Sequence, residues 1–376
     1  MFYGSVERNI STDWTKVAKN VWQTSGLDAD IGNIIFDHEA AFGIKVPFVE
    51  RLNKLGEFWY DKQGKNLLLY SAVNPSTFYY DIELAVTRDI IKETNTSYVT
   101  YENLDLRYGG AHGIGGDGTH DIIIRSVDIS YMGGGYLFGF DTTRYGNGVE
   151  FYNSAENNVV EQCTFSQIYD AAMTSQGDKP HHTVRRLYFI NNIVSKCEQS
   201  FELWIRGEGS VMTDIYFDNN TCMNAGYGIT HAQRPDVNGA HLLFWGFGNG
   251  TVVKNIFIRN NIFYNARDWS IFWNTPADIT AMSIDSNCWF MTEGPIAKLG
   301  DDKIDFVNQW NEYVKKTGQD KHSIAKDPLL QGADCMLAPA SPCIDAGLTL
   351  DRVNTDFTGS LRKRNYYDIG AYEYSP

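Results

Sequence analysis

Seven short segments of the chain share one pattern of polar and apolar residues, and successive copies begin 23 to 41 residues apart. A unit of that size is too small to bury its own apolar face, so each copy must pack against its neighbours. This repetition restricts the chain to stacked architectures. The copies are ENLDL (102–106), RSVDI (125–129), EQCTF (161–165), INNIV (190–194), DNNTC (218–222), RNNIF (259–263) and DSNCW (285–289).

Apolar and polar residues alternate around each copy, which is typical of short strands. The last four copies have asparagine at their centre, where a side-chain amide can bond to the next copy and the backbone tolerates a left-handed bend. A propeller would need a regular period of about 42 residues, and a leucine-rich horseshoe would need a leucine frame with helices. The sequence therefore predicts an all-β fold, a single-stranded right-handed parallel β-helix. The central asparagines are Asn192, Asn220, Asn261 and Asn287.

A second strand is predicted about ten residues after each copy. Two long insertions, at 131–147 and around 234–250, flank this second strand, so both should overhang the same face of the stack. Insertions that gather on one face usually build the binding cleft. The predicted second strands are HGIGG (112–116), GVEFYN (148–153), AAMTSQ (171–176), FELWIR (201–206), GITHAQ (228–233), SIFWN (270–274) and PIAKL (295–299).

The remaining sequence divides into segments that flank these coils. We expect an N-terminal β-rich cap segment at 1–92 and the coils at 93–300. Apolar residues with helical spacing predict an amphipathic helix excursion at 301–326. Residues 327–376 are expected to form a last coil and a C-terminal cap, because an exposed sheet edge invites aggregation.

Charge and composition exclude several classes of protein. The chain has 46 Asp and Glu against 32 Lys and Arg, a formal net charge of -14, so we expect no nucleic-acid partner. No run approaches the ~18 apolar residues that a membrane span needs. The polar N-terminal stretch has no signal-peptide core. We expect a secreted or periplasmic protein whose signal is absent from this chain, with a cytoplasmic location as the alternative.

No motif for a metal or a cofactor stands out. The six cysteines lack the paired short spacing of a zinc site, and the aspartates lack the spacing of a calcium loop. The Gly-rich stretches at 107–118 and 132–136 lack the lysine of a phosphate-binding loop. The sequence therefore predicts no metal ion and no cofactor.

Two parts of the sequence resemble a known group of proteins. The run DPLL (327–330), SPCIDAG (341–347), DFTG (356–359) and DIGAYEY (368–374) resembles the closing segment of bacterial right-handed β-helix proteins, which are mostly carbohydrate-active and belong to the pectin-lyase-like superfamily. The run FWYD…LLLYS (58–71), followed by YVTYENLDLRYGGAHGIGG (98–116), is similar to the first coils of β-helix glycoside hydrolases related to fucosidases and xylanases. The resemblance implies cleavage of a glycosidic bond in a polysaccharide or oligosaccharide.

Three acidic residues on the second strands are the candidate catalytic groups. Alternation points Glu150 and Glu202 outwards onto one face, and Asp170 lies at the start of the strand between them. Neighbouring coils lie about 4.8 Å apart, so residues one or two coils apart are separated by roughly 5 or 9.5 Å. Glycoside hydrolysis needs two carboxyl groups about 5–5.5 Å apart for retention or about 6.5–9.5 Å apart for inversion. Two of the three are predicted to act as general acid and as base or nucleophile.

A hydrolase also needs a surface that holds the sugar. Tyr152, Trp204 and Trp245 can stack on sugar rings, and Gln176 can bind hydroxyl groups.

A different chemistry stays open at the same face. A polysaccharide lyase or epimerase abstracts a proton next to a uronate carboxylate, which needs a base and a cation to neutralise the carboxylate. His231 or Tyr152 can serve as the base, and Arg206 or Arg234 as the cation, with His112 nearby. The second alternative is a non-catalytic glycan-binding or tailspike-like module.

Overall fold

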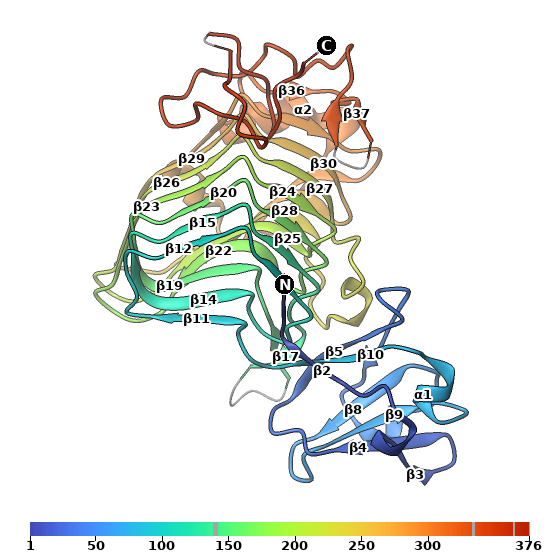
Figure 1. The fold of residues 1–376 in the computed structure, drawn as a ribbon. Helices are drawn as coiled ribbons and strands as arrows, with labels where there is room; N and C mark the ends of the chain where they lie inside the picture. Colours follow the sequence, from blue (N-terminus) through green and yellow to red (C-terminus); the bar gives the residue numbers. More distant parts are fainter. Residues whose placement is uncertain (138–141, 333–334, 364, 376) are drawn as a thin grey trace.

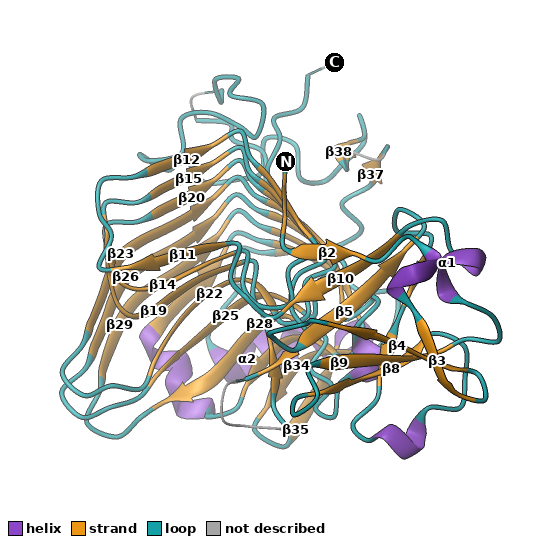
Figure 2. Cartoon of the chain, turned by 60° about the horizontal axis from the view of Figure 1, so that its bottom comes forward, coloured by secondary structure: helices purple, strands orange, loops and turns teal. Residues whose placement is uncertain are grey.

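The computed structural model describes residues 1–137, 142–332, 335–363 and 365–375. Most strands from residue 91 onward, together with one strand at the N-terminus, form three long rows (Figures 1 and 2). Within a row the neighbours pair in parallel, apart from the last pair of the third row. The first row contains β1 (Phe2–Tyr3), β13 (Asp105–Arg107), β16 (Asp128–Ser130), β21 (Thr164–Ser166), β24 (Ile193–Ser195), β27 (Thr221–Ala225), β30 (Ile262–Ala266), β33 (Cys288–Phe290) and β36 (Ile324–Ala325).

The other two rows join through pairing of β19 with β23. The second row contains β12 (Thr100–Glu102), β15 (Ile123–Arg125), β20 (Val159–Glu161), β23 (Thr183–Ile190), β26 (Val211–Asp218), β29 (Val252–Arg259) and β32 (Met282–Asp285). The third row contains β11 (Ile91–Thr94), β14 (Ile114–His120), β19 (Val149–Glu156), β22 (Ala171–Gly177), β25 (Gln199–Ile205), β28 (Ala240–Phe247), β31 (Trp269–Trp273) and β34 (Pro295–Leu299), and ends with antiparallel β35 (Asp302–Asp305).

The strand registers confirm the alignment of the seven copies. In the second row Ile124 pairs with Tyr101 and Val160, and the column continues through every copy. The first-row column lies inside the stack and forms much of the main hydrophobic core. Its members are at most 1% exposed: Leu106, Ile129, Phe165, Val194, Cys222, Phe263 and Trp289.

The central asparagines form a buried ladder of hydrogen bonds, as the sequence predicts. Nδ2 of Asn192 donates to Oδ1 of Asn220 at 3.0 Å, and Nδ2 of Asn220 donates to Oδ1 of Asn261 at 3.0 Å. The ladder ends on Asn287, whose Oδ1 accepts from Asn261 at 3.0 Å. Each amide therefore links one copy to the next.

The predicted left-handed bend at these asparagines is wrong by one residue. The ladder amide must point into the core while another residue turns the chain, so the two tasks fall on neighbouring positions. The residues with positive φ precede the ladder: Asn191 (54°), Asn219 (55°), Asn260 (54°) and Ser286 (58°).

The predicted strand at 228–233 is also wrong. This segment is a loop with the short 3-10 helix η3 (His231–Gln233), and β28 takes the expected place in the third row, where Leu242 pairs with Phe201. Gly, Pro and Asn residues in GITHAQRPDVNG favour a loop, whereas AHLLFWGF has the apolar character of a buried strand. The insertion therefore occupies residues 226–239 and precedes β28.

A separate unit, residues 5–86, lies beside one end of the stack (blue in Figure 1). We call it the N-terminal unit. It has its own hydrophobic core between two sheets, and it includes the short helix α1 (Pro75–Phe78). One sheet contains β2 (Ser5–Glu7), β10 (Ile82–Val86), β5 (Ile31–Phe36) and β6 (Ala41–Phe42); the other contains β3 (Thr15–Ala18), β4 (Val21–Ser25), β9 (Asn66–Tyr70), β8 (Glu57–Asp61) and β7 (Ile44–Lys45).

Helix α2 (Phe306–Thr317) covers the other end of the stack (Figure 1). The C-terminal segment runs along the outside of the coils, where its backbone accepts hydrogen bonds from Gln162, Asn191 and Asn219. The hydroxyl of buried Tyr313 donates to Asp320 at 2.7 Å, which anchors the helix. The C-terminal segment contains the hairpin β37 (Leu330–Gln331) and β38 (Met336–Leu337), and its buried Arg362 bonds to Glu373 at 2.7 Å. Within the described ranges, no helix combines the length and the apolar character needed to cross a membrane.

Candidate functional site

The outer face of the third row carries the candidate site. Alternate residues of a strand point away from the core, and here Glu150 of β19 aligns with Thr174 of β22, which aligns with Glu202 of β25. Glu150 is 7% exposed and Glu202 is 6% exposed. Two acidic side chains thus lie two strands apart on one face, in a place that water hardly reaches.

Glu150 contacts His112, which lies just before β14. Nε2 of His112 is 2.5 Å from Oε2 of Glu150, and Nδ1 accepts a hydrogen bond from the backbone N–H of Asn147 at 3.1 Å. The Asn147 donor occupies Nδ1, so the proton facing Glu150 lies on Nε2. This contact stabilises negative charge on Glu150.

The surroundings of Glu202 favour its protonated form. Burial raises the pKa of Glu202, and the carboxylates of Asp170 and Glu150 raise it further, to about 8. Arg234 and Gln176 oppose this shift, and Nε2 of Gln176 donates to Oε2 of Glu202 at 2.5 Å. At neutral pH Glu202 therefore holds a proton, which is the state that a general acid needs.

Asp170 lies immediately before β22 and is held on both oxygens. Its Oδ1 is 2.5 Å from Nη1 of Arg234, and its Oδ2 accepts from the backbone N–H of Gly146 at 3.1 Å. Burial raises the pKa of Asp170, and the Arg234 guanidinium lowers it. Asp170 thus joins the insertion that carries Arg234 to the face that carries Glu202.

The next outward column consists of Tyr152, Gln176 and Trp204. The rings of Tyr152 and Trp204 meet edge to face with centroids 6.2 Å apart, and the guanidinium of exposed Arg206 lies 5.3 Å from the Trp204 ring. The structure therefore groups these predicted substrate-binding residues beside the two glutamates.

Trp245 lies at a bulge of β28, where Phe244 pairs with Leu203 but Gly246 pairs with Trp204. Its ring packs edge to face on Phe272 at 5.7 Å. The bulge adds an aromatic side chain one strand beyond Trp204 on the same row.

His231 and Arg234 anchor the insertion rather than project from it. Nδ1 of buried His231 is 3.0 Å from Oε2 of Glu198, and Nε of Arg234 is 3.7 Å from the other oxygen. One atom each of His231, Glu198 and Asp268 lie within 4.8 Å of one another, a spacing that suits a metal ion. Two backbone N–H groups of the insertion already donate to these carboxylates, and Arg234 adds positive charge. The cluster therefore acts as an ion-pair network that holds the insertion on the stack.

Two residues of this region were not predicted. Glu198 has a fully buried side chain and occupies the position before β25 that Asp170 occupies before β22, because Ala171 pairs with Gln199. Extending the alignment of the second strands by one residue towards the N-terminus would place Glu198 in the same column as Asp170. Tyr145 lies in the insertion at 131–147 with its ring 5.1 Å from that of His112. No periodic signal marks it.

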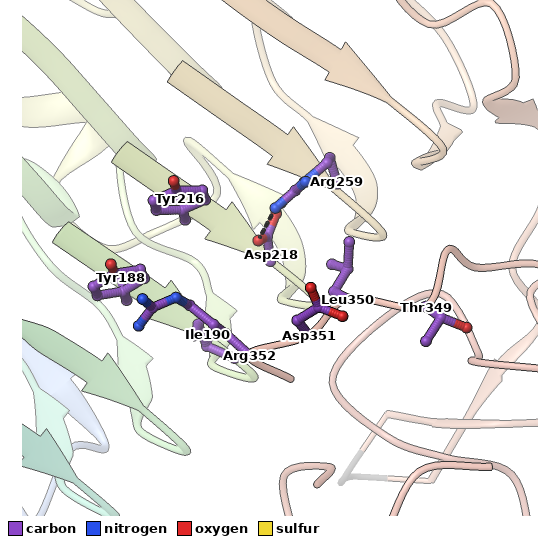
Figure 3. A pocket seen from close by; sticks show the side chains of 9 residues that line it. All are labelled: Tyr188, Ile190, Tyr216, Asp218, Arg259, Thr349, Leu350, Asp351 and Arg352. Carbon is purple, nitrogen blue, oxygen red and sulfur yellow. Dashed lines mark hydrogen bonds and ion pairs between the residues drawn. The ribbon is translucent and has the colours of Figure 1, made fainter. Parts of the chain in front are cut away.

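A cavity of about 300 Å³ lies elsewhere, between the second row and residues 349–352 (Figure 3). The rings of Tyr188 and Tyr216 stack 5.0 Å apart along its floor. Asp218 pairs with Arg259 at 2.6 Å (dashed in Figure 3), so the buried carboxylate of this cavity is already neutralised. The candidate chemistry therefore belongs to the third row.

The pKa of Glu202 has a consequence for stability. Between pH 4.5, the ordinary pKa of this glutamate, and about pH 8, its pKa in the fold, the folded protein holds a proton that the unfolded chain releases. This group's stabilising contribution is complete below pH 4.5 and is lost as the pH rises to about 8. We expect the wild-type free energy of unfolding to fall relative to that of Glu202→Gln by up to about 1.4 kcal/mol per pH unit in this window. Urea titrations of both proteins from pH 5 to pH 9 measure the difference; parallel curves would contradict it.

Comparison with known proteins adds little. No family model matches the chain, and no curated protein sequence matches it. A solved structure described as "Glycoside hydrolase" has a TM-score of 0.37 and 10% identity, covering 67% of this chain and 56% of its own, so the chain spans just over half of that length. Another, described as "The complex structure of XylC with xylose", has a TM-score of 0.38 and 10% identity, covering 100% of this chain and 87% of its own.

Proposed function

We propose that this protein hydrolyses a glycosidic bond in a polysaccharide or oligosaccharide, with Glu202 as general acid and Glu150 as the second carboxylate. The observation that carries the proposal is the contrast between these two neighbours. Glu202 is buried with its pKa raised to about 8, whereas Glu150 contacts His112 at 2.5 Å. Two carboxyl groups on one face, one with a raised pKa and the other in contact with a histidine, match the acid and the base of glycoside hydrolysis.

We also propose that the stack is a single-stranded right-handed parallel β-helix. The parallel registers of all three rows and the asparagine ladder support it. In this fold the outward face of the third row forms an extended surface, which suits a chain of sugars.

The separation of Glu150 and Glu202 favours inversion. They align through Thr174, so one strand lies between them and their backbones are about 9.5 Å apart. That spacing leaves room for a water molecule, as inverting enzymes require. Asp170 is bonded through both oxygens, so in this proposal it positions Arg234 and raises the pKa of Glu202.

Elimination is less well supported at the same face. His231 is paired with Glu198, and Arg234 is paired with Asp170, so neither is available as the base or the cation that a lyase needs. Arg206 is exposed but lies over Trp204.

Product analysis tests the reaction type. The protein is incubated with neutral and uronic-acid polysaccharides in water enriched in heavy oxygen, and the products are analysed by mass spectrometry. Hydrolysis adds one labelled oxygen per bond cleaved, and NMR of the new reducing end should show inverted configuration. Unsaturated, unlabelled products would contradict hydrolysis, and binding without any product would identify a non-catalytic glycan-binding module.

A further inference from the structure

A cavity of about 730 Å³ opens between the N-terminal unit and the insertion at 131–147. The insertion contributes its hairpin, β17 (Gly135–Tyr136) and β18 (Arg144–Tyr145). The volume lies within the range of about 300–1,000 Å³ typical of small-molecule sites. Residues from parts of the chain more than 80 positions apart line it, among them Asp28, Trp59, Tyr60, Tyr136 and Tyr145.

Several aromatic side chains line this cavity. Trp59 and Tyr60 come from β8 of the N-terminal unit, and Tyr136 and Tyr145 come from the hairpin. Trp59 is partly exposed, so part of its ring is open to a ligand. Aromatic rings combined with a few polar groups suit a sugar, which has apolar C–H faces and a rim of hydroxyl groups.

One wall of the cavity leads to Glu150 through two side chains. Tyr145 lines the cavity, its ring lies 5.1 Å from the His112 ring, and His112 contacts Glu150 at 2.5 Å. Burial raises the pKa of Tyr145 to about 12, with Asp89, Glu150 and Asp30 contributing. A sugar unit held in the cavity is therefore separated from Glu150 only by the thickness of two side chains.

Most of the charge on the lining is balanced within the protein. Asp28 pairs with Arg88 at 2.5 Å, and Asp30 pairs with buried Lys45 at 2.6 Å. The third aspartate of the lining lies among two lysines. The cavity therefore presents no strong charge of either sign, and its aromatic rings suit a neutral sugar.

We propose that this cavity is a subsite for a neutral sugar of the substrate, with Trp59 as its stacking surface. The proposal rests on the function proposed above, and it makes the N-terminal unit part of the substrate-binding surface. The Asp61 carboxylate can accept hydrogen bonds from sugar hydroxyls, and the balanced charges of the lining give a uronate no added attraction. The substrate class is then a neutral glycan rather than a uronic-acid polymer.

Binding and kinetics of Trp59 variants test this subsite. Tryptophan fluorescence titrations use xylotetraose, cellotetraose and mannotetraose as neutral probes and tetragalacturonate as the anionic probe. We expect at least one neutral probe to bind and Trp59→Ala to weaken that binding by about tenfold or more. Trp59→Phe keeps a ring and should retain most of the affinity. Tyr98→Ala, whose parent side chain is 78% exposed outside the cavity, is the matched control and should bind as the wild type does.

The outcomes separate this proposal from the proposed function. If Trp59→Ala raises KM and leaves kcat within a few-fold, the subsite is supported. If Trp59→Ala and Trp59→Phe both bind as the wild type does, if tetragalacturonate binds tightest, or if no neutral probe binds, the subsite is wrong even where hydrolysis is observed. If Trp59→Ala loses neutral-probe binding but the wild type releases no product from any glycan, the subsite stands and the hydrolase proposal fails.

Discussion

Replacing Glu202 with glutamine is expected to lower kcat by about 10²–10⁴-fold on any glycan that the wild type cleaves, because the general acid is removed. The substitution is nearly isosteric. It also removes an ionisable group whose burial and acidic neighbours raise its pKa to about 8, so the fold should tolerate it. KM should change little, because the proton is needed in the transition state rather than for binding. Steady-state kinetics with circular dichroism as a folding check measure both effects.

The dependence of wild-type kcat on pH should reflect the ionisation of Glu202. Glu202 must carry its proton to act as an acid, so kcat should fall as the pH rises through about 8. In Glu202→Gln this limb should disappear from whatever activity remains.

A matched control separates this effect from loss of any buried carboxylate. Asp218 is 3% exposed, burial raises its pKa, and it lies in the second row. Asp218→Asn should therefore leave kcat unchanged, whereas Glu150→Gln should lower it about as far as Glu202→Gln does. If both glutamate variants turn over substrate as fast as the wild type does, the proposed site is wrong.

Replacing Asn220 with alanine is expected to lower the free energy of unfolding by about 3–5 kcal/mol, a large part of a typical domain's stability. Oδ1 of Asn220 accepts from the backbone N–H of Asn192 at 2.8 Å and from its side chain at 3.0 Å. Nδ2 donates to the Phe189 carbonyl at 2.9 Å and to Asn261 at 3.0 Å. Alanine removes all four bonds and leaves the buried backbone N–H of Asn192 without this partner, although the Asn192 and Asn261 side chains each keep at least one other bond. Water does not reach the site, because the Asn220 side chain is 0% exposed.

Urea denaturation followed by circular dichroism measures this loss. Asn255→Ala is the control, because Asn255 is exposed, has φ 57°, and makes one hydrogen bond, to Asp214 at 2.9 Å. It should cost about 1 kcal/mol, mainly from the left-handed backbone. Equal losses in the two variants would show that the ladder contributes no more than a surface turn does.

Repetition made the core of the stack predictable. Each strand of the first row has the same short alternation, and the columns through Leu106 and Ile124 follow from it because a strand places alternate residues on opposite sides. The outward direction of Glu150 and Glu202 follows in the same way. The predicted strand at 228–233 is wrong because one copy carries a loop of irregular length before its second strand, and the spacing of the other copies then points to the wrong segment.

The repeats alone are enough to predict the parallel stacking, the buried asparagine ladder and the outward face that carries the two glutamates. The groups near these glutamates come together only in the folded chain: His112 at Glu150, Arg234 at Asp170, and Trp59 in the cavity beyond Tyr145. Alternation and stacking depend on residues that repeat within one or two strands. The protonation of a carboxyl group depends on the few charges that insertions and a distant unit bring near it, and no local pattern encodes those contacts.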